Sequence, residues 1–156
     1  MDRKLPTSAE PLLAELLEII ELSTPLSWET ARVSVQSTVL TSMWSLSVVT
    51  GDGTTKPATL QKAFSPKLAE FRGACYEEGR GTWYSAAITL HKGGEPDVRL
   101  YYDEKPEWRR GAWPHPGTYV RDLEFFPRAE EHVPDWLREQ VDLAAEAETS
   151  GWQNER

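Results

Sequence analysis

A cluster of ionisable and aromatic residues lies where a predicted strand ends, in the stretch YYDEKPEW at residues 101–108. Three of its side chains are carboxylates: Asp103, Glu104 and Glu107. Paired carboxylates can act as general acid and general base when they flank one scissile bond. The same groups could instead bind a metal, end a strand in solvent or contact another protein. The elements that position them must decide between these roles.

The spacing of Asp103 and Glu104 argues against paired acid/base chemistry. Adjacent residues of a strand point to opposite faces of a sheet, so these two carboxylates cannot flank one bond without a bulge. We therefore assign Tyr102 to packing and expect Asp103, Glu104 and Glu107 to lie at the surface.

A small enzyme or metal-binding protein is the alternative interpretation, with Asp103, His115 and Asp122 as its residues. The three histidines of the chain match no metal-binding spacing such as H-x-E-x-H. The chain also contains no P-loop, no G-x-S-x-G nucleophile motif and no dinucleotide-binding glycine motif. Cys75 falls at a helical apolar spacing, which is typical of a small core residue. We expect no catalytic residue, no cofactor and no metal.

A second group of carboxylates lies on the closing helix, which is predicted over VPDWLREQVDLAAEAE at residues 133–148. Four acidic residues follow one another at spacings of four, three and four, which places them within a sector of about 60° of the helix. We call them the acidic stripe: Asp135, Glu139, Asp142 and Glu146. Leu137, Val141 and Ala144 fall on the opposite side, so the helix should pack by that side and present the acidic stripe to solvent.

The negative charge of the chain is concentrated in its C-terminal third. The 156 residues carry a formal charge of −8, and residues 95–148 contain fourteen Asp and Glu against seven Lys and Arg, a net charge of −7. This charge disfavours direct binding to nucleic acid or a membrane surface and favours a basic protein partner. We expect the acidic stripe, together with Asp103, Glu104 and Glu107, to bind that partner. A role in solubility alone is the alternative for the acidic stripe.

The compartment follows from the cysteine count and from the start of the chain. A single cysteine excludes an internal disulfide, and the start MDRKLPTSAEPLL lacks the apolar core of a signal peptide. No run of 18 apolar residues is present. We expect a soluble cytoplasmic protein, and its oligomeric state is left open.

Hydrophobic periodicity predicts one α+β domain over residues 1–150, followed by a flexible tail at 151–156. An amphipathic helix is expected within residues 7–23, two strands between 28 and 50, and a short edge strand containing Pro57. A second helix should have Ser65 as its N-cap, Pro66 as its first residue and Gly79 as the C′ residue that follows its end. A hairpin follows over 81–104. The fold class is therefore an antiparallel β-sheet meander with N-terminal, middle and C-terminal helices packed on it.

Two stretches of the chain resemble the YezG-like family of bacterial immunity proteins. They are RGTWYSAAITLHKGGEPDVRLYYDEKPEW at 80–108 and YVRDLEFFPRAEEHVPDWL at 119–137. The marked positions are Trp83 and Tyr84, the YDEKPEW end at 102–108, Phe126–Pro127–Arg128, and Pro134 with Trp136–Leu137. The resemblance implies an antitoxin without catalytic activity. Proteins of that family neutralise the toxic C-terminal domains of secreted polymorphic toxins. We therefore expect this protein to bind such a domain and to block its active site or substrate groove.

Overall fold

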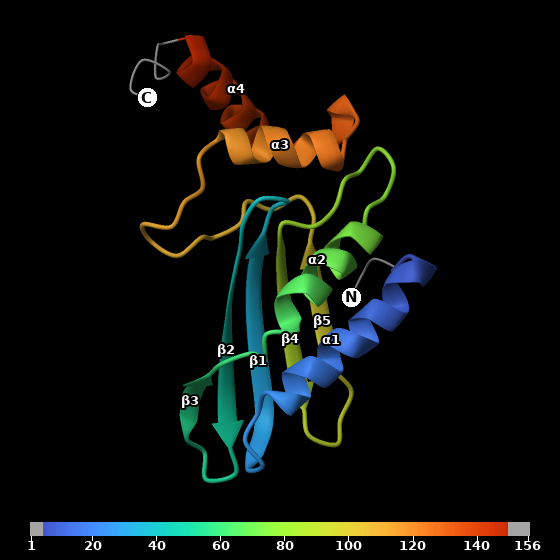
Figure 1. Cartoon of the computed structure of the whole chain (residues 1–156), viewed down its shortest axis with the longest axis vertical. Coiled ribbons are helices and arrows are strands. Elements are labelled where there is room, and N and C mark those ends of the chain that lie inside the picture. Colours follow the sequence, from blue (N-terminus) through green and yellow to red (C-terminus); the bar gives the residue numbers. More distant parts are fainter. Residues whose placement is uncertain (1–4, 150–156) are drawn as a thin grey trace.

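Alternating apolar residues build a five-stranded antiparallel sheet. The computed structural model describes residues 5–149, so the predicted tail at 151–156 lies outside the described residues. The strands are β1 (Trp28–Ser37), β2 (Ser42–Thr50), β3 (Thr55–Ala58), β4 (Ser85–His91) and β5 (Asp97–Tyr101). Their order in the sheet is β3-β2-β1-β4-β5, so β1 pairs with both β2 and β4 (Figure 1). The predicted edge position of the strand that contains Pro57 is confirmed.

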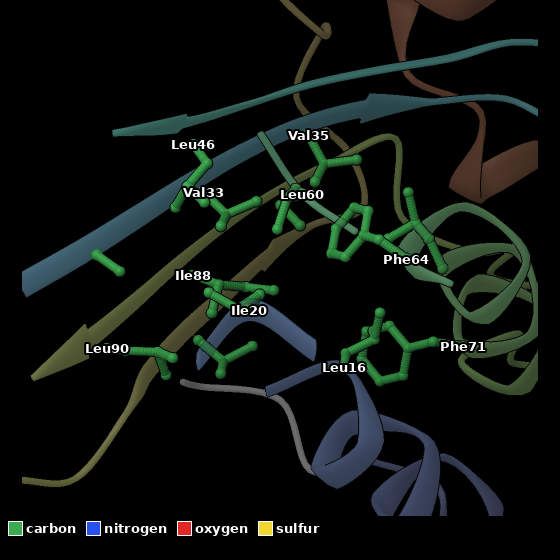
Figure 2. Close-up of a cluster of buried hydrophobic side chains, with 14 of the residues drawn as sticks. Leu16, Ile20, Val33, Val35, Leu46, Leu60, Phe64, Phe71, Ile88 and Leu90 are labelled. Atoms are coloured by element: carbon green, nitrogen blue, oxygen red, sulfur yellow. The ribbon is translucent and has the colours of Figure 1, made fainter. Parts of the chain in front are cut away.

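Two helices cover one face of this sheet. They are α1 (Glu10–Leu22), which follows a 3-10 turn at Thr7–Ala9, and α2 (Phe64–Ala74) (Figure 1). Figure 2 shows their apolar side chains meeting those of the strands in the core, including Leu16, Ile20, Val33, Phe64, Phe71 and Ile88. Each fully buried side chain of this size contributes about 1.5–3 kcal/mol. The other face of the sheet presents polar residues such as Arg32 and Ser34 to solvent.

The bounds of α2 differ from the prediction. The helix begins at Phe64 and ends at Ala74, and no side chain caps its N-terminus, so Ser65 is not the cap. Gly79 does not end the helix either. Gly79 and Gly81 have φ angles of 82° and 81° in the turn that leads from α2 towards β4. Gly79 has the left-handed backbone that is typical of a residue after a helix, but it belongs to this turn and not to the end of α2.

The C-terminal helices are α3 (Gly117–Phe125) and α4 (Asp135–Thr149), with a 3-10 turn at Glu130–His132 between them. They lie beyond the end of the sheet where β1 and β5 finish (Figure 1). A second, smaller core cluster of Tyr84, Tyr119 and Leu137 joins them to the start of β4. The predicted α+β fold class with an antiparallel sheet is confirmed, and α1 and α2 pack on the sheet as expected. Two details differ: α3 and α4 lie beyond the end of the sheet (Figure 1), and the meander of β1, β2 and β3 is extended by β4, which pairs with β1. Among the described residues, no helix is both long and apolar enough to cross a bilayer.

Candidate functional site

The helix α4 holds the acidic stripe in the orientation that the sequence predicted. Leu137 and Ala144 are buried and Val141 is half-buried, so the apolar side of the helix faces the rest of the molecule. All four carboxylates of the acidic stripe belong to exposed residues. At a rise of 1.5 Å per residue, the first and last of them are separated by about 16 Å along the helix axis. The arrangement is a row of anionic groups on the exposed side of a helix whose apolar side packs against the rest of the molecule.

One cation lies among these carboxylates and was not anticipated. Arg138 is on the same side of α4, and its Nη1 is 2.6 Å from Oε1 of Glu130. This contact lowers the pKa of Glu130, and the pKa of Arg138 is raised by Glu130 and further by Asp142 and Asp135. With Arg138 included, the acidic stripe has a local charge of −3, from four carboxylates and one guanidinium.

The three carboxylates of residues 103–107 are not equivalent. Asp103 pairs with Arg128 at 2.9 Å, and its side chain is 54% exposed whereas that of Arg128 is 1% exposed. Glu104 and Glu107 are exposed. Asp103 therefore compensates a buried guanidinium, and this structural role was missed because nothing in the local sequence links it to Arg128.

A hydrogen bond places the 103–107 segment beside the acidic stripe. The indole Nε1 of Trp136, in the first turn of α4, donates to the carbonyl oxygen of Asp103 at 2.7 Å. Asp103 and the N-terminal end of the acidic stripe are thus brought together, although they are more than 30 residues apart in the chain. The backbone of the 103–107 segment therefore contacts the first turn of α4, where the acidic stripe begins.

The residues of the alternative enzyme or metal site are not brought into a common site. Asp122 is 1% exposed, and its carboxylate accepts hydrogen bonds from Arg72 and from the backbone N–H of Val39. His115 is exposed, and its Nδ1 accepts from the backbone N–H of Gly117. Within residues 5–149, no three His, Cys, Asp or Glu side chains are grouped as metal ligands would be.

Cys75 is buried, as the sequence predicted, but it lies immediately after α2 and not within it. Burial raises the pKa of its thiol to about 11. The thiolate is the nucleophilic form, so this cysteine has little reactivity near neutral pH. The hydroxyl of Tyr102 donates to the Cys75 carbonyl oxygen at 2.7 Å, which gives Tyr102 the packing role assigned to it.

A buried polar group, which we call the junction, joins the sheet to the C-terminal helices. Its members are Arg72, Trp83, Tyr84, Asp122 and Arg128. Arg72 makes two hydrogen bonds to Asp122, at 2.7 and 3.0 Å, and its Nε donates to the carbonyl of Trp83 at 2.7 Å. Paired, planar contacts of this kind are strong and specify one orientation. The junction therefore fixes α3 against α2 and β4.

Arg128 completes the junction from the other side. It donates to the carbonyls of Thr82, Tyr102 and His132 as well as to Asp103. The guanidinium carbons of Arg72 and Arg128 each lie 5.3 Å from the centre of the Tyr84 ring. Burial raises the pKa of Tyr84, so its hydroxyl stays protonated. The sequence did offer one signal of this arrangement, because Arg72 follows Leu68 by four residues on the buried side of α2.

Comparisons with known proteins do not identify a family. No family model matches the chain, and no curated protein is significantly similar to it. The resemblance to YezG-like immunity proteins therefore depends on the two stretches quoted above. Their marked residues Trp83, Tyr84 and Arg128 belong to the junction, and Trp136 packs on the Tyr84 ring at 5.2 Å. These four positions therefore hold the fold together.

Proposed function

We propose that this protein is a cytoplasmic immunity protein that binds a toxin domain with a basic surface and blocks its active site or substrate groove. The observation that carries the proposal is the acidic stripe, an exposed row of four carboxylates on a helix packed by its other side. The resemblance to YezG-like antitoxins supports the same function. In this proposal the protein performs no reaction itself.

The energetics of the acidic stripe support a binding role over a folding role. Carboxylates three or four residues apart on a helix repel one another and reduce its stability slightly. Exposed charges also contribute little to folding when they are paired. A row of like charges does, however, attract a basic partner over distance and favour one orientation of encounter. The arrangement therefore benefits association more than the fold.

The experiment begins with identification of the partner. Affinity capture with the full chain, followed by mass spectrometry, should recover a toxin domain, and its association with the immunity protein is then measured by stopped flow at two salt concentrations. The variant Glu139→Lys/Asp142→Lys should associate at least about tenfold more slowly at low salt, because the attraction that steers encounter is reversed. The difference should shrink at about 1 M salt, where the Debye length is about 3 Å.

A matched control separates this local effect from net charge. Glu18 and Glu21 are exposed residues of α1, so Glu18→Lys/Glu21→Lys makes the same change in net charge away from the acidic stripe. That control should associate nearly as fast as the wild type. If the acidic-stripe variant and the control associate with the toxin domain at equal rates and with unchanged affinity, the acidic stripe serves solubility alone.

A further inference from the structure

A cationic turn lies beside α4, and its cations have no part in the proposed function. We use this name for residues 105–113, which carry Lys105, Arg109 and Arg110 against one carboxylate, Glu107. All three cations are exposed. Within residues 5–149 the structure gives none of them an ion pair. The turn is thus a local positive surface, of net charge +2 from three cations and one carboxylate, on a protein of net charge −8.

The cationic turn is held in place by one buried side-chain contact and two hydrogen bonds from its backbone. Trp108 is buried, and its Nε1 donates to the hydroxyl of Tyr119 at 2.9 Å. The backbone N–H of Arg109 donates to the sulfur of Met43, and that of Ala112 donates to the Arg109 carbonyl across Gly111, whose φ is 85°. A surface fixed in this way loses little entropy when it binds.

An exposed tryptophan adds apolar surface to these charges. Trp113 is 66% exposed, and it borders a cavity of about 210 Å³. The other residues that line this cavity are Lys105, Trp108, Pro114, Tyr119 and Gln140. Tryptophan and arginine are the residues most enriched among those that dominate binding energy at protein interfaces. The cationic turn therefore has the composition of a contact surface.

The cationic turn and the acidic stripe are connected through α4. Gln140 lines the cavity beside Trp113, and Leu143, which is 41% exposed, is on the same helix. At 100° per residue, Leu143 lies between Gln140 and the acidic stripe around the helix axis. Lys105 and Trp113 of the cationic turn thus border the same cavity as Gln140, and Leu143 leads from Gln140 to the carboxylates around α4.

We propose that two copies of this chain associate through this surface, with the cationic turn of each copy against the acidic stripe of the other. A two-fold symmetric interface requires a patch that is complementary to itself. A patch with a net charge of +2 on one side, −3 on the other and exposed Trp113 and Leu143 between them meets that requirement. The proposal does not depend on the toxin. If both proposals hold, self-association and toxin binding compete for the acidic stripe.

The test measures self-association of the full chain by sedimentation velocity over a dilution series, in about 10 mM and about 1 M salt, where the Debye lengths are about 30 and 3 Å. We expect a dimer that is tighter at low salt. Arg109→Glu/Arg110→Glu and Glu139→Lys/Asp142→Lys should each weaken it at least about tenfold. Trp113→Ala should also weaken it while the thermal stability of the monomer stays unchanged, because this side chain is mostly exposed.

The decisive arm combines the two reversals in one protein. If the two surfaces contact each other, the quadruple variant restores opposite charges across the interface and should recover dimerisation. The control Arg32→Glu/Arg99→Glu changes the same number of exposed arginines on the sheet and should leave the dimer intact. A protein that is monomeric throughout the series at low salt would overturn the proposal. A dimer that neither reversal weakens, or that the combined reversal fails to restore, would overturn it as well.

Discussion

The junction and the acidic stripe both contain charged side chains, but they differ in burial and in the pairing of their charges. In the junction, Arg72 and Asp122 are 2% and 1% exposed, and each is matched by an opposite charge at hydrogen-bonding distance. On the acidic stripe, like charges stand next to one another in solvent. The charges of the junction are therefore compensated within the chain, whereas those of the acidic stripe create an electrostatic field in the surrounding solvent.

The role of a carboxylate is therefore decided by the groups that surround it. Asp122 and Asp103 were both candidates for chemistry or docking, but each is used to compensate a buried arginine. A buried charge without its partner is far more costly than an exposed one. Substitutions in the junction should therefore lower the free energy of unfolding. Substitutions in the acidic stripe should instead change the rate of association with a partner.

The largest effect is expected at Asp122. Asp122→Asn removes the charge that compensates Arg72 in a buried site, and removal of one partner of a buried ion pair costs about 3–5 kcal/mol. Equilibrium unfolding in denaturant, with the midpoint and slope fitted together, measures the change.

The control for this substitution is Asp142→Asn on the acidic stripe, which should change the free energy of unfolding by no more than about 0.5 kcal/mol. The double variant Arg72→Met/Asp122→Leu should recover part of the loss, because apolar residues can replace a buried ion pair. Similar free energies of unfolding for Asp122→Asn and Asp142→Asn would show that the buried carboxylate contributes no more to stability than the exposed one.

A smaller effect is expected at Gly81, which lies against the junction. Its φ is 81°, and an added Cβ would lie 2.5 Å from Nε of Arg128. Gly81→Ala should therefore incur the left-handed backbone penalty, roughly 1–2 kcal/mol, and also displace Arg128 from its hydrogen bonds. Thermal and denaturant unfolding of the variant give the total cost.

Gly93 is a matched control, because its φ is 75° but no atom lies within 4 Å of an added Cβ. Gly93→Ala should show the backbone penalty alone. An excess of about 1–2 kcal/mol for Gly81→Ala would then measure the displacement of Arg128. Equal costs for the two alanine variants would mean that Arg128 moves aside freely and that the junction is less tightly constrained than its contacts indicate.

Local patterns predicted the elements well and the contacts between them poorly. The β4–β5 hairpin and α4 were found because period-two and helical alternation are properties of short windows. The pairing of β1 with β4 and the contact of Arg72 with Asp122 join residues about 50 positions apart or more, and no short window encodes them. The end of α2 was also missed, because Gly79 is a turn signal that fits several elements.

In the candidate site too, local features were predicted from the sequence and contacts between elements were not. The acidic stripe depended only on helical spacing and lies where it was predicted, on the exposed side of α4. The ion pair of Asp103 with Arg128 and that of Arg138 with Glu130 depend on how separate elements meet, so they became visible only in the structure. The partner-binding role of these carboxylates remains a prediction for the experiments above.

The smallest effects are expected for neutral substitutions on α4, which should change the free energy of unfolding in opposite directions. Glu139 is placed four residues after Asp135 and three before Asp142, so Glu139→Gln should raise the free energy of unfolding slightly by removing repulsion. Arg138→Gln should lower it, because Arg138 pairs with Glu130 and attracts the neighbouring carboxylates. Both differences should shrink at high salt, where exposed charges are screened. Unfolding curves recorded in parallel at two salt concentrations resolve the two signs. If Glu139→Gln proved destabilising at low salt, this carboxylate would be contributing to the fold, and the contrast with the junction would fail at that position.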